Sequence, residues 1–155
     1  MTEHAAAAAA PAPRSFNAAA TGGWTVAQRG VLVICVLQLA WAVAGFLAEP
    51  SFDLGAGAPT ASVLWVDFNG VHALSGLLLF GPGLLFATRP AWAVLYSFAA
   101  AGALIATGLW ALVSTHPAYV FTFPNNERDA VLHLATGIAF GVLGLVQARR
   151  DRAAL

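Results

Sequence analysis

Long stretches of apolar residues alternate with short polar segments along this chain, and their lengths predict its secondary structure. Four stretches without a charged residue cover residues 30–48, 68–88, 91–113 and 130–148. At a rise of about 1.5 Å per residue, each is long enough to cross a hydrocarbon layer of about 30 Å, with some tilt where it is longer. We therefore expect four membrane-spanning helices, at about residues 28–48, 66–88, 91–113 and 129–148.

The segments outside these stretches are polar or poor in bulky residues. Residues 1–26 are rich in Ala, Pro and Gly and lack apolar periodicity, so we expect a disordered tail. Residues 114–126 contain Pro, Asn and aromatic residues, which is typical of an interfacial loop. Residues 149–155 form a basic tail, which leaves residues 27–148 as one membrane domain. A secretory signal cleaved near Ala42-Val43-Ala44 is the alternative interpretation of the first stretch.

The composition agrees with a membrane protein and excludes several other classes. Of 155 residues, 59% are hydrophobic and 9% are charged, whereas soluble domains carry about 25% charged residues. The formal net charge is zero, so there is no basic surface to bind nucleic acid. One cysteine, Cys35, excludes a disulfide framework and a site built from several cysteines.

The distribution of charge predicts how the helices are oriented. Six of the seven arginines fall on the side of the membrane that holds both termini, and five of the seven acidic residues fall on the other side. Because positive residues are retained in the cytoplasm, we expect both termini to be cytoplasmic. The predicted location is the bacterial inner membrane.

The second and fourth apolar stretches share a short motif. His72 is followed by Ser75-Gly76, and His133 is followed by Thr136-Gly137 at the same spacing. Each half of the chain is then a helical hairpin that carries His-x-x-[Ser/Thr]-Gly on its second helix. The prediction is an all-α four-helix bundle made of two parallel pseudo-repeated hairpins.

Helical spacing places glycines on the same faces as the two histidines. Residues three or four positions apart share one face of a helix, and small residues there allow close packing of helices. We therefore expect both histidines to point into the bundle, at similar depth in its outer half. The predicted packing residues are Gly76, Gly83, Gly137, Gly141 and Gly144.

Three interpretations of the histidine pair remain open. In the first, each imidazole forms hydrogen bonds within the bundle, for example His133 with Asp129 one turn earlier. In the second, His72 and His133 are the axial ligands of a b-type haem. In the third, the two histidines belong to a proton or small-molecule pathway of a small transporter.

Other catalytic patterns are weak in this sequence. Ser75 lies three residues after His72, but no third orienting group follows from the spacing. Asn126 is a candidate N-cap for the last helix, and Asp129 lies in the first turn, where the helix dipole favours negative charge. We therefore expect neither an enzyme nor a metal site, and no cofactor apart from the haem alternative.

These motifs resemble a known family. Gly45-Phe46, Asn69-Gly-Val-His72 with Ser75-Gly76, and Asn126-x-x-Asp129-x-x-Leu132-His133 are similar to the four-helix membrane family named domain of unknown function 4383, found mainly in high-GC bacteria. The resemblance covers about residues 27–147. That family often has a second histidine near the position of His72, which this chain lacks. The resemblance implies a compact integral membrane protein with no assigned activity.

The sequence as a whole favours a small non-enzymatic membrane protein. We expect an accessory subunit of a membrane complex or a self-associating bundle, with the lipid bilayer and other membrane proteins as its partners and no nucleic acid. Its candidate binding residues are Asn69, His72, Asn126, Asp129 and His133. A b-haem or quinone-linked redox protein using His72 and His133 is the first alternative, and a small transporter is the second.

Overall fold

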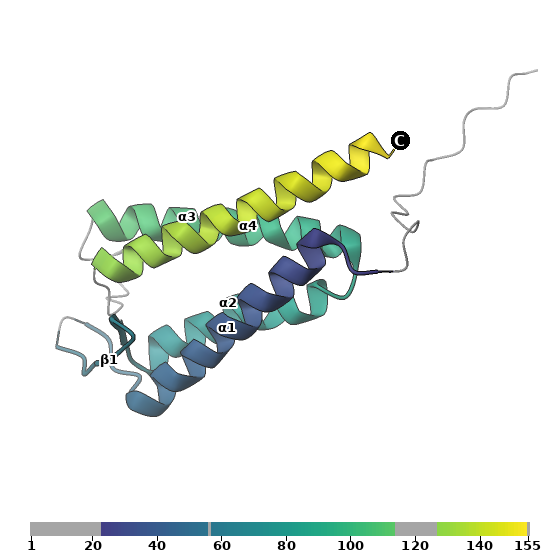
Figure 1. The fold of residues 1–155 in the computed structure, drawn as a ribbon. Coiled ribbons are helices and arrows are strands. Elements are labelled where there is room, and N and C mark those ends of the chain that lie inside the picture. The colour runs from purple at the N-terminus through teal and green to yellow at the C-terminus, as the bar shows by residue number, and fades with distance from the viewer. Residues whose placement is uncertain (1–22, 56, 114–126, 155) are drawn as a thin grey trace, which may run out of the picture.

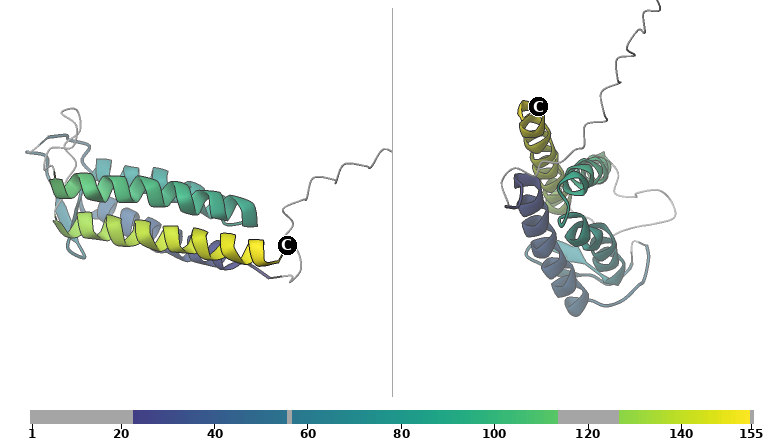
Figure 2. Two further views of the ribbon diagram at one scale, coloured as in Figure 1. Left: turned by 90° about the horizontal axis from the view of Figure 1, so that it is seen from above. Right: turned by 90° about the vertical axis from the view of Figure 1, so that its right-hand side faces the viewer.

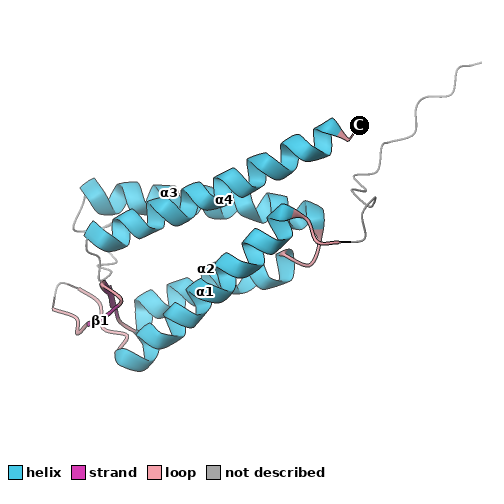
Figure 3. Cartoon of the chain, in the orientation of Figure 1, coloured by secondary structure: helices cyan, strands magenta, loops and turns pink. Residues whose placement is uncertain are grey.

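The computed structural model describes residues 23–55, 57–113 and 127–154. This part of the chain forms four helices and one two-stranded antiparallel sheet (Figure 1, Figure 3). The elements are α1 (Val26–Ala48), β1 (Ala61–Val63), β2 (Val66–Phe68), α2 (Gly70–Phe86), α3 (Pro90–Val113) and α4 (Glu127–Ala153). The four expected helices are therefore present. The expected tail at residues 1–22 and the expected loop at 114–126 lie outside the described residues.

Helix α1 begins at a capping box and is tied to the end of α2. The Thr25 hydroxyl accepts from the Gln28 backbone N–H, and the Gln28 side chain accepts from the Thr25 backbone N–H. These bonds satisfy backbone donors that the first turn of a helix leaves without partners. The Gln28 amide also donates to the buried Ala87 carbonyl at 2.9 Å. One side chain therefore begins α1 and holds it against the end of α2.

Helix α2 starts later than the sequence predicts. The expected span at residues 66–88 begins as a strand, because Val66 pairs with Val63 and Phe68 pairs with Ala61 in a hairpin. Leu64 and Trp65 form its two-residue turn with positive φ angles of 49° and 73°. A two-residue turn of this kind matches the twist of the paired strands.

Helices α3 and α4 pack closely against each other through small residues. A Cβ added to Gly108 would lie 2.9 Å from the Ala130 carbonyl oxygen, and one added to Gly137 would lie 3.0 Å from the Ile105 backbone nitrogen. The other four glycines predicted as packing residues also face neighbouring helices: Gly76 faces Ala42 on α1, Gly83 faces Cys35 on α1 and Tyr96 on α3, and Gly141 and Gly144 face Ala101 and Phe98 on α3. Glycines thus allow close packing within each hairpin, and Gly83 also lies at a contact between the hairpins.

The bundle consists of two hairpins, α1 with α2 and α3 with α4 (Figure 1, Figure 2). The start of α1 and the end of α4 lie at one end of the bundle, and the β-hairpin lies at the other (Figure 1). Helix α1 contacts α3 and α4, whereas no Cα atom of α2 comes within 8 Å of one in α4. Helices α2 and α4 therefore contact each other through side chains and not through close backbone packing.

The lengths and exteriors of the helices are those of a membrane protein. Helices α1, α3 and α4 are long and apolar enough to span a membrane, whereas α2, with 17 residues, is shorter. Large apolar side chains cover the outside, and Leu78 and Leu85 on α2 are 69% and 74% exposed. Helix α4 continues to Ala153, so the arginines expected in a separate tail at residues 149–155 lie on its last turns, where the helix dipole favours positive charge.

Candidate functional site

Two histidines and one aspartate meet at the end of the bundle that carries the β-hairpin. His72 lies in the first turn of α2, and Asp129 and His133 lie one turn apart at the start of α4. One ligand atom from each of these three side chains lies within 4.8 Å of the other two. The two histidine rings are 6.3 Å apart between centroids and are tilted by 26°. Each hairpin therefore contributes at least one side chain to a single cluster, which we call the His–Asp–His cluster.

His72 is held from three sides by groups close to it in the sequence. Asn69, fully buried as the N-cap of α2, accepts a hydrogen bond from the His72 backbone N–H at 3.0 Å. The Nδ1 atom of His72 lies 2.9 Å from the backbone carbonyl oxygen of Asp67, at the end of the hairpin. The ring of Phe68 stacks on the imidazole with centroids 4.5 Å apart. The hairpin thus fixes the orientation of this ring.

Asp129 connects the two histidines. Its carboxylate is 3.1 Å from His133 Nδ1 and 3.8 Å from His72 Nε2. The Nδ1 atom of His133 also lies 2.9 Å from the backbone carbonyl of Asp129, one helical turn earlier. Asp129 is only 5% exposed, so its charge interacts mainly with these neighbours rather than with solvent. The predicted His133–Asp129 contact is confirmed, and His72 joins it.

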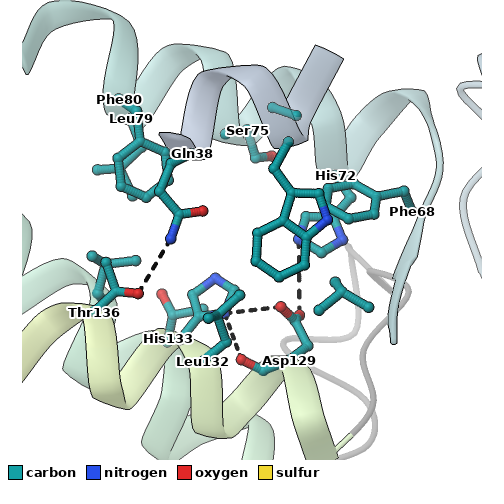
Figure 4. A pocket seen from close by; sticks show the side chains of 16 residues that line it. Gln38, Phe68, His72, Ser75, Leu79, Phe80, Asp129, Leu132, His133 and Thr136 are labelled. Carbon is teal, nitrogen blue, oxygen red and sulfur yellow. Dashed lines mark hydrogen bonds and ion pairs between the residues drawn. The ribbon is translucent and has the colours of Figure 1, made fainter. Parts of the chain in front are cut away.

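The backbone carbonyls determine which nitrogen of each ring can bind a ligand. A carbonyl oxygen only accepts, so the Nδ1 atoms of both histidines carry the hydrogen in the neutral form. The lone pair then lies on Nε2 in both rings. The Nε2 of His72 faces Asp129, and the second nitrogen of His133 points away from Asp129 toward the cavity (Figure 4). Metal-binding histidines are commonly oriented in this way by a carbonyl on the opposite nitrogen.

A cavity of about 140 Å³ adjoins the cluster and extends between the two hairpins. His72, Asp129 and His133 line it at one side, and Gln38 and Thr136 lie on the other (Figure 4). The Gln38 amide on α1 donates to the Thr136 hydroxyl on α4 at 3.2 Å. The remaining wall is mostly apolar and includes Trp41, Phe68, Leu79, Phe80, Leu104 and Leu132. The cavity is therefore polar at the cluster and apolar elsewhere.

The structure brings together most, but not all, of the residues proposed from the sequence. His72, Asp129 and His133 form the cluster. Asn69 bonds to the backbone of His72 and does not line the cavity. Asn126 lies outside the described residues. Ser75 lines the cavity, but its hydroxyl donates to the Val71 carbonyl of its own helix, so it is not paired with His72 as a nucleophile.

Two residues of the site had no assigned role in the sequence interpretation. Gln38 is a polar residue inside the first apolar stretch, and Trp41 lies in the same stretch. In the structure both line the cavity, and Trp41 also donates from Nε1 to the Val63 carbonyl at 3.0 Å, which holds the β-hairpin against α1. Gln38 could have been identified as a candidate from the sequence, because it is the strong polar residue of the first apolar stretch.

The comparisons with known proteins identify a family but assign no activity. The family model described as Domain of unknown function (DUF4383) matches residues 28–146, which include most of both hairpins and every residue of the cluster. Neither a curated protein nor a solved structure matches the chain at a significant level. Because the family model covers most of the sequence, the chain belongs to the DUF4383 family.

Proposed function

We propose that this protein is a small integral membrane protein that binds a divalent transition-metal ion between its two hairpins. The observation that carries this proposal is the His–Asp–His cluster, in which both rings have Nδ1 against a backbone carbonyl. Such carbonyls leave the Nε2 lone pair of each ring available, that of His72 next to the buried Asp129 carboxylate and that of His133 toward the cavity. The cluster therefore offers two imidazoles and one carboxylate as ligands, with the orientation of the His72 ring already set by its neighbours.

The type of donor favours a transition metal over Mg²⁺ or Ca²⁺. Imidazole suits zinc, copper, iron and nickel, whereas Mg²⁺ and Ca²⁺ prefer sites made of oxygen atoms. Two histidines with one carboxylate also form the ligand set of many sites for zinc or non-haem iron. The cluster supplies this combination from His72, His133 and Asp129.

The distances permit binding after a small adjustment. A tetrahedral ion with bonds of about 2.0–2.2 Å would hold its ligand atoms about 3.3 Å apart. The separation of His72 Nε2 and Asp129 Oδ2, 3.8 Å, is close to this value, and one ring nitrogen of His133 completes a set of three atoms within 4.8 Å of one another. Because His133 Nδ1 faces Asp129, coordination through Nε2 requires the His133 ring to turn about its side-chain torsions and to give up its Nδ1 contact with the Asp129 carbonyl.

The size of the cavity favours a metal ion over the haem alternative. Pockets for drug-sized ligands measure about 300–1,000 Å³, and a haem is at least as large as such ligands. The cavity next to His72 and His133 measures about 140 Å³, so a macrocycle would require the hairpins to separate. A haem therefore predicts a different arrangement of α2 and α4, and an absorption spectrum of protein from its native membrane tests for it.

The metal proposal is tested by measuring metal bound to the full-length protein in mild detergent. We expect one Zn²⁺ or Co²⁺ per chain after dialysis against a low concentration of free ion, measured by mass spectrometry of the elements. His72→Gln, His133→Gln and Asp129→Asn should each weaken binding by about tenfold or more, because each removes one ligand. Ser75→Ala is the matched control, since it lines the same cavity but supplies no ligand.

The same measurement can contradict the proposal. If the wild-type protein retains no metal, or if the three ligand variants retain as much as Ser75→Ala, the cluster is only a set of hydrogen bonds between helices. Circular dichroism of each variant shows whether a loss of metal reflects a loss of helix instead.

Lateral association is a second candidate function, in line with an accessory or self-associating role. One exposed face of α3 carries small residues at helical spacing: Ala99, Gly102, Ala103 and Ala106. A Cβ added to Gly102 would meet nothing within 4 Å, so this face is open in the single chain. Small residues at this spacing allow close packing of membrane helices.

Association is tested with two differently tagged copies of the chain in one membrane. We expect Gly102→Leu to reduce their co-purification, because a larger side chain prevents close packing of α3 against a partner. Val36→Phe, on the exposed face of α1, is the control for a larger apolar side chain facing lipid. Equal co-purification of the wild type and Gly102→Leu would contradict association through α3.

A further inference from the structure

We infer that the metal site accepts an additional ligand from the cavity, and that this ligand is a compact organic anion that binds through oxygen. This inference rests on the proposed metal-binding function and adds the class of molecule that the site takes. It is carried by the position of the His–Asp–His cluster in the wall of the cavity and by the chemistry of the other walls.

The first step concerns the coordination of the ion. Closed structural zinc sites have four protein ligands, whereas sites that bind and exchange a small molecule have three and an open position. In the part of the chain that the structure describes, the cluster has three members, His72, Asp129 and His133, and all three line the cavity. An ion held by them is therefore in contact with the cavity, and its open position faces that space.

The second step concerns charge. A divalent ion bound by two neutral imidazoles and one carboxylate keeps a net charge of +1. Asp129 is 5% exposed, and the side chains of His72 and His133 are 13% and 20% exposed, so this charge would be largely removed from water. An uncompensated charge in such surroundings is costly. A ligand with one negative charge makes the complex neutral, which favours anions over neutral molecules and cations.

The third step concerns size and shape. The cavity measures about 140 Å³, close to the volume of about 150 Å³ that accommodates benzene in an apolar protein cavity. Away from the cluster, its wall includes Leu79, Phe80 and Leu104. The ligand therefore has its anionic oxygen at the metal and an apolar body no larger than one six-membered ring. An aromatic or short aliphatic carboxylate meets these requirements, whereas a molecule with two fused rings does not.

The experiment uses full-length protein in mild detergent, loaded with Co²⁺, whose visible absorption bands change when a ligand enters its coordination sphere. The probes are benzoate, 2-naphthoate, benzyl alcohol and benzylamine, which separate size from charge. We expect benzoate to change the spectrum saturably, and to bind at least ten times more tightly than the three other probes.

Variants of the cavity wall connect the spectral change to this site. Leu104→Phe reduces the space while leaving the metal ligands in place, so we expect Co²⁺ to remain bound and benzoate to lose at least tenfold in affinity. Leu104→Ala enlarges the space, so it should admit 2-naphthoate. The two variants change the volume in opposite directions, so a general loss of structure cannot produce both results.

His116, which lies outside the described residues, serves to test whether the chain itself fills the open position. We expect His116→Gln to bind Co²⁺ and benzoate as the wild type does. If wild-type Co²⁺ is insensitive to benzoate, or becomes sensitive only in His116→Gln, the position is closed by the protein and the inference is wrong, although metal binding stands. If no Co²⁺ binds to the cluster at all, the proposed function itself fails, and the inference fails with it.

Discussion

At the scale of single residues, the site depends on side chains that hold the backbone rather than on the histidines alone. Asn69 is fully buried, its carbonyl oxygen accepts from the His72 backbone N–H, and its amide donates to the Asp53 carbonyl at 3.1 Å. It therefore joins the segment after α1 to the start of α2. The N-cap of the helix and the position of His72 are set by the same side chain.

Replacement of Asn69 by Ala should destabilise the protein. The change removes an N-cap and leaves the Asp53 carbonyl without this donor, which together cost about 1–3 kcal/mol. Thermal unfolding in detergent, followed by circular dichroism, measures the loss. Asn69→Ser keeps a neutral capping acceptor but not the amide donor, so its melting temperature should fall between those of Asn69→Ala and the wild type. Equal melting temperatures for all three proteins would show that neither bond contributes.

At the scale of elements, the contact between α3 and α4 positions Asp129 and His133 relative to the rest of the bundle. Gly108 lies against the Ala130 carbonyl and Leu134, the residues that directly follow Asp129 and His133 in α4. Because backbone atoms form part of this contact, a larger residue at position 108 cannot be accommodated by moving a side chain alone.

Gly108→Ala should therefore separate the two helices and destabilise the bundle, by about 1–3 kcal/mol as for other overpacked cores. The matched control is Gly102→Ala on the same helix, where a Cβ would meet nothing within 4 Å. That change should stabilise α3 by up to about 1 kcal/mol, since Ala is the better helix former. Denaturant unfolding of both variants in detergent measures the two changes in the free energy of unfolding, which we expect to have opposite signs. A stabilising effect of Gly108→Ala would show that α3 and α4 are not in close contact.

The β-hairpin is the second element on which the site depends. Trp41 donates to the Val63 carbonyl and its ring lies 6.1 Å from that of Phe68, while the strand ending at Phe68 supplies the Asp67 carbonyl that orients His72. The hairpin and α1 are therefore linked through Trp41.

Trp41→Phe should loosen this hairpin and leave the helices folded. It keeps an aromatic ring but loses one hydrogen bond, worth about 0.5–1.5 kcal/mol. Hydrogen exchange of the amides in residues 61–68 should accelerate, while exchange within α3 and α4 stays unchanged. Trp24→Phe, at an exposed position before α1, is the control and should leave the hairpin amides as in the wild type. Unchanged exchange in Trp41→Phe would show that the strands hold together without this bond.

The whole molecule holds its two hairpins together at more than one level along the bundle. The Tyr96 hydroxyl on α3 donates to the Leu79 carbonyl on α2 at 2.8 Å, and at the end with the β-hairpin the His–Asp–His cluster and the Gln38–Thr136 bond connect the hairpins to each other. With the start of α1 and the end of α4 at the same end, the distribution of arginine predicts that the cluster lies on the side away from the cytoplasm.

Labelling of single cysteines in intact cells tests this orientation. Cys35 is fully buried, so it can be replaced by Ser to give a background without reactive thiols. We expect Ser62→Cys, at the hairpin end, to react with a membrane-impermeant maleimide from outside the cell. Ala153→Cys, at the end of α4, should react only after the membrane is permeabilised. The reverse pattern would place the termini outside.

The sequence determined the features of this protein that depend on neighbouring residues. Four apolar stretches of sufficient length predicted four helices, and the contact between His133 and Asp129 followed from their spacing within one helical turn. The β-hairpin was missed for an equally local reason. Its turn is formed by Leu64 and Trp65 rather than by the Asn-Gly or Asp-Gly that identifies such turns, and its strands have three residues each.

How distant segments meet depends on the packing of the helices in three dimensions. The repeat predicted similar depths for His72 and His133, but the rotation of α2 relative to α4 decides whether both rings reach the same carboxylate. Likewise, the polarity of Gln38 could be read from the sequence, whereas its position opposite the cluster depends on the packing of α1 against α4. Hydrophobic patterns specify which residues avoid water. The packing of whole helices determines which polar groups then share the space that is left.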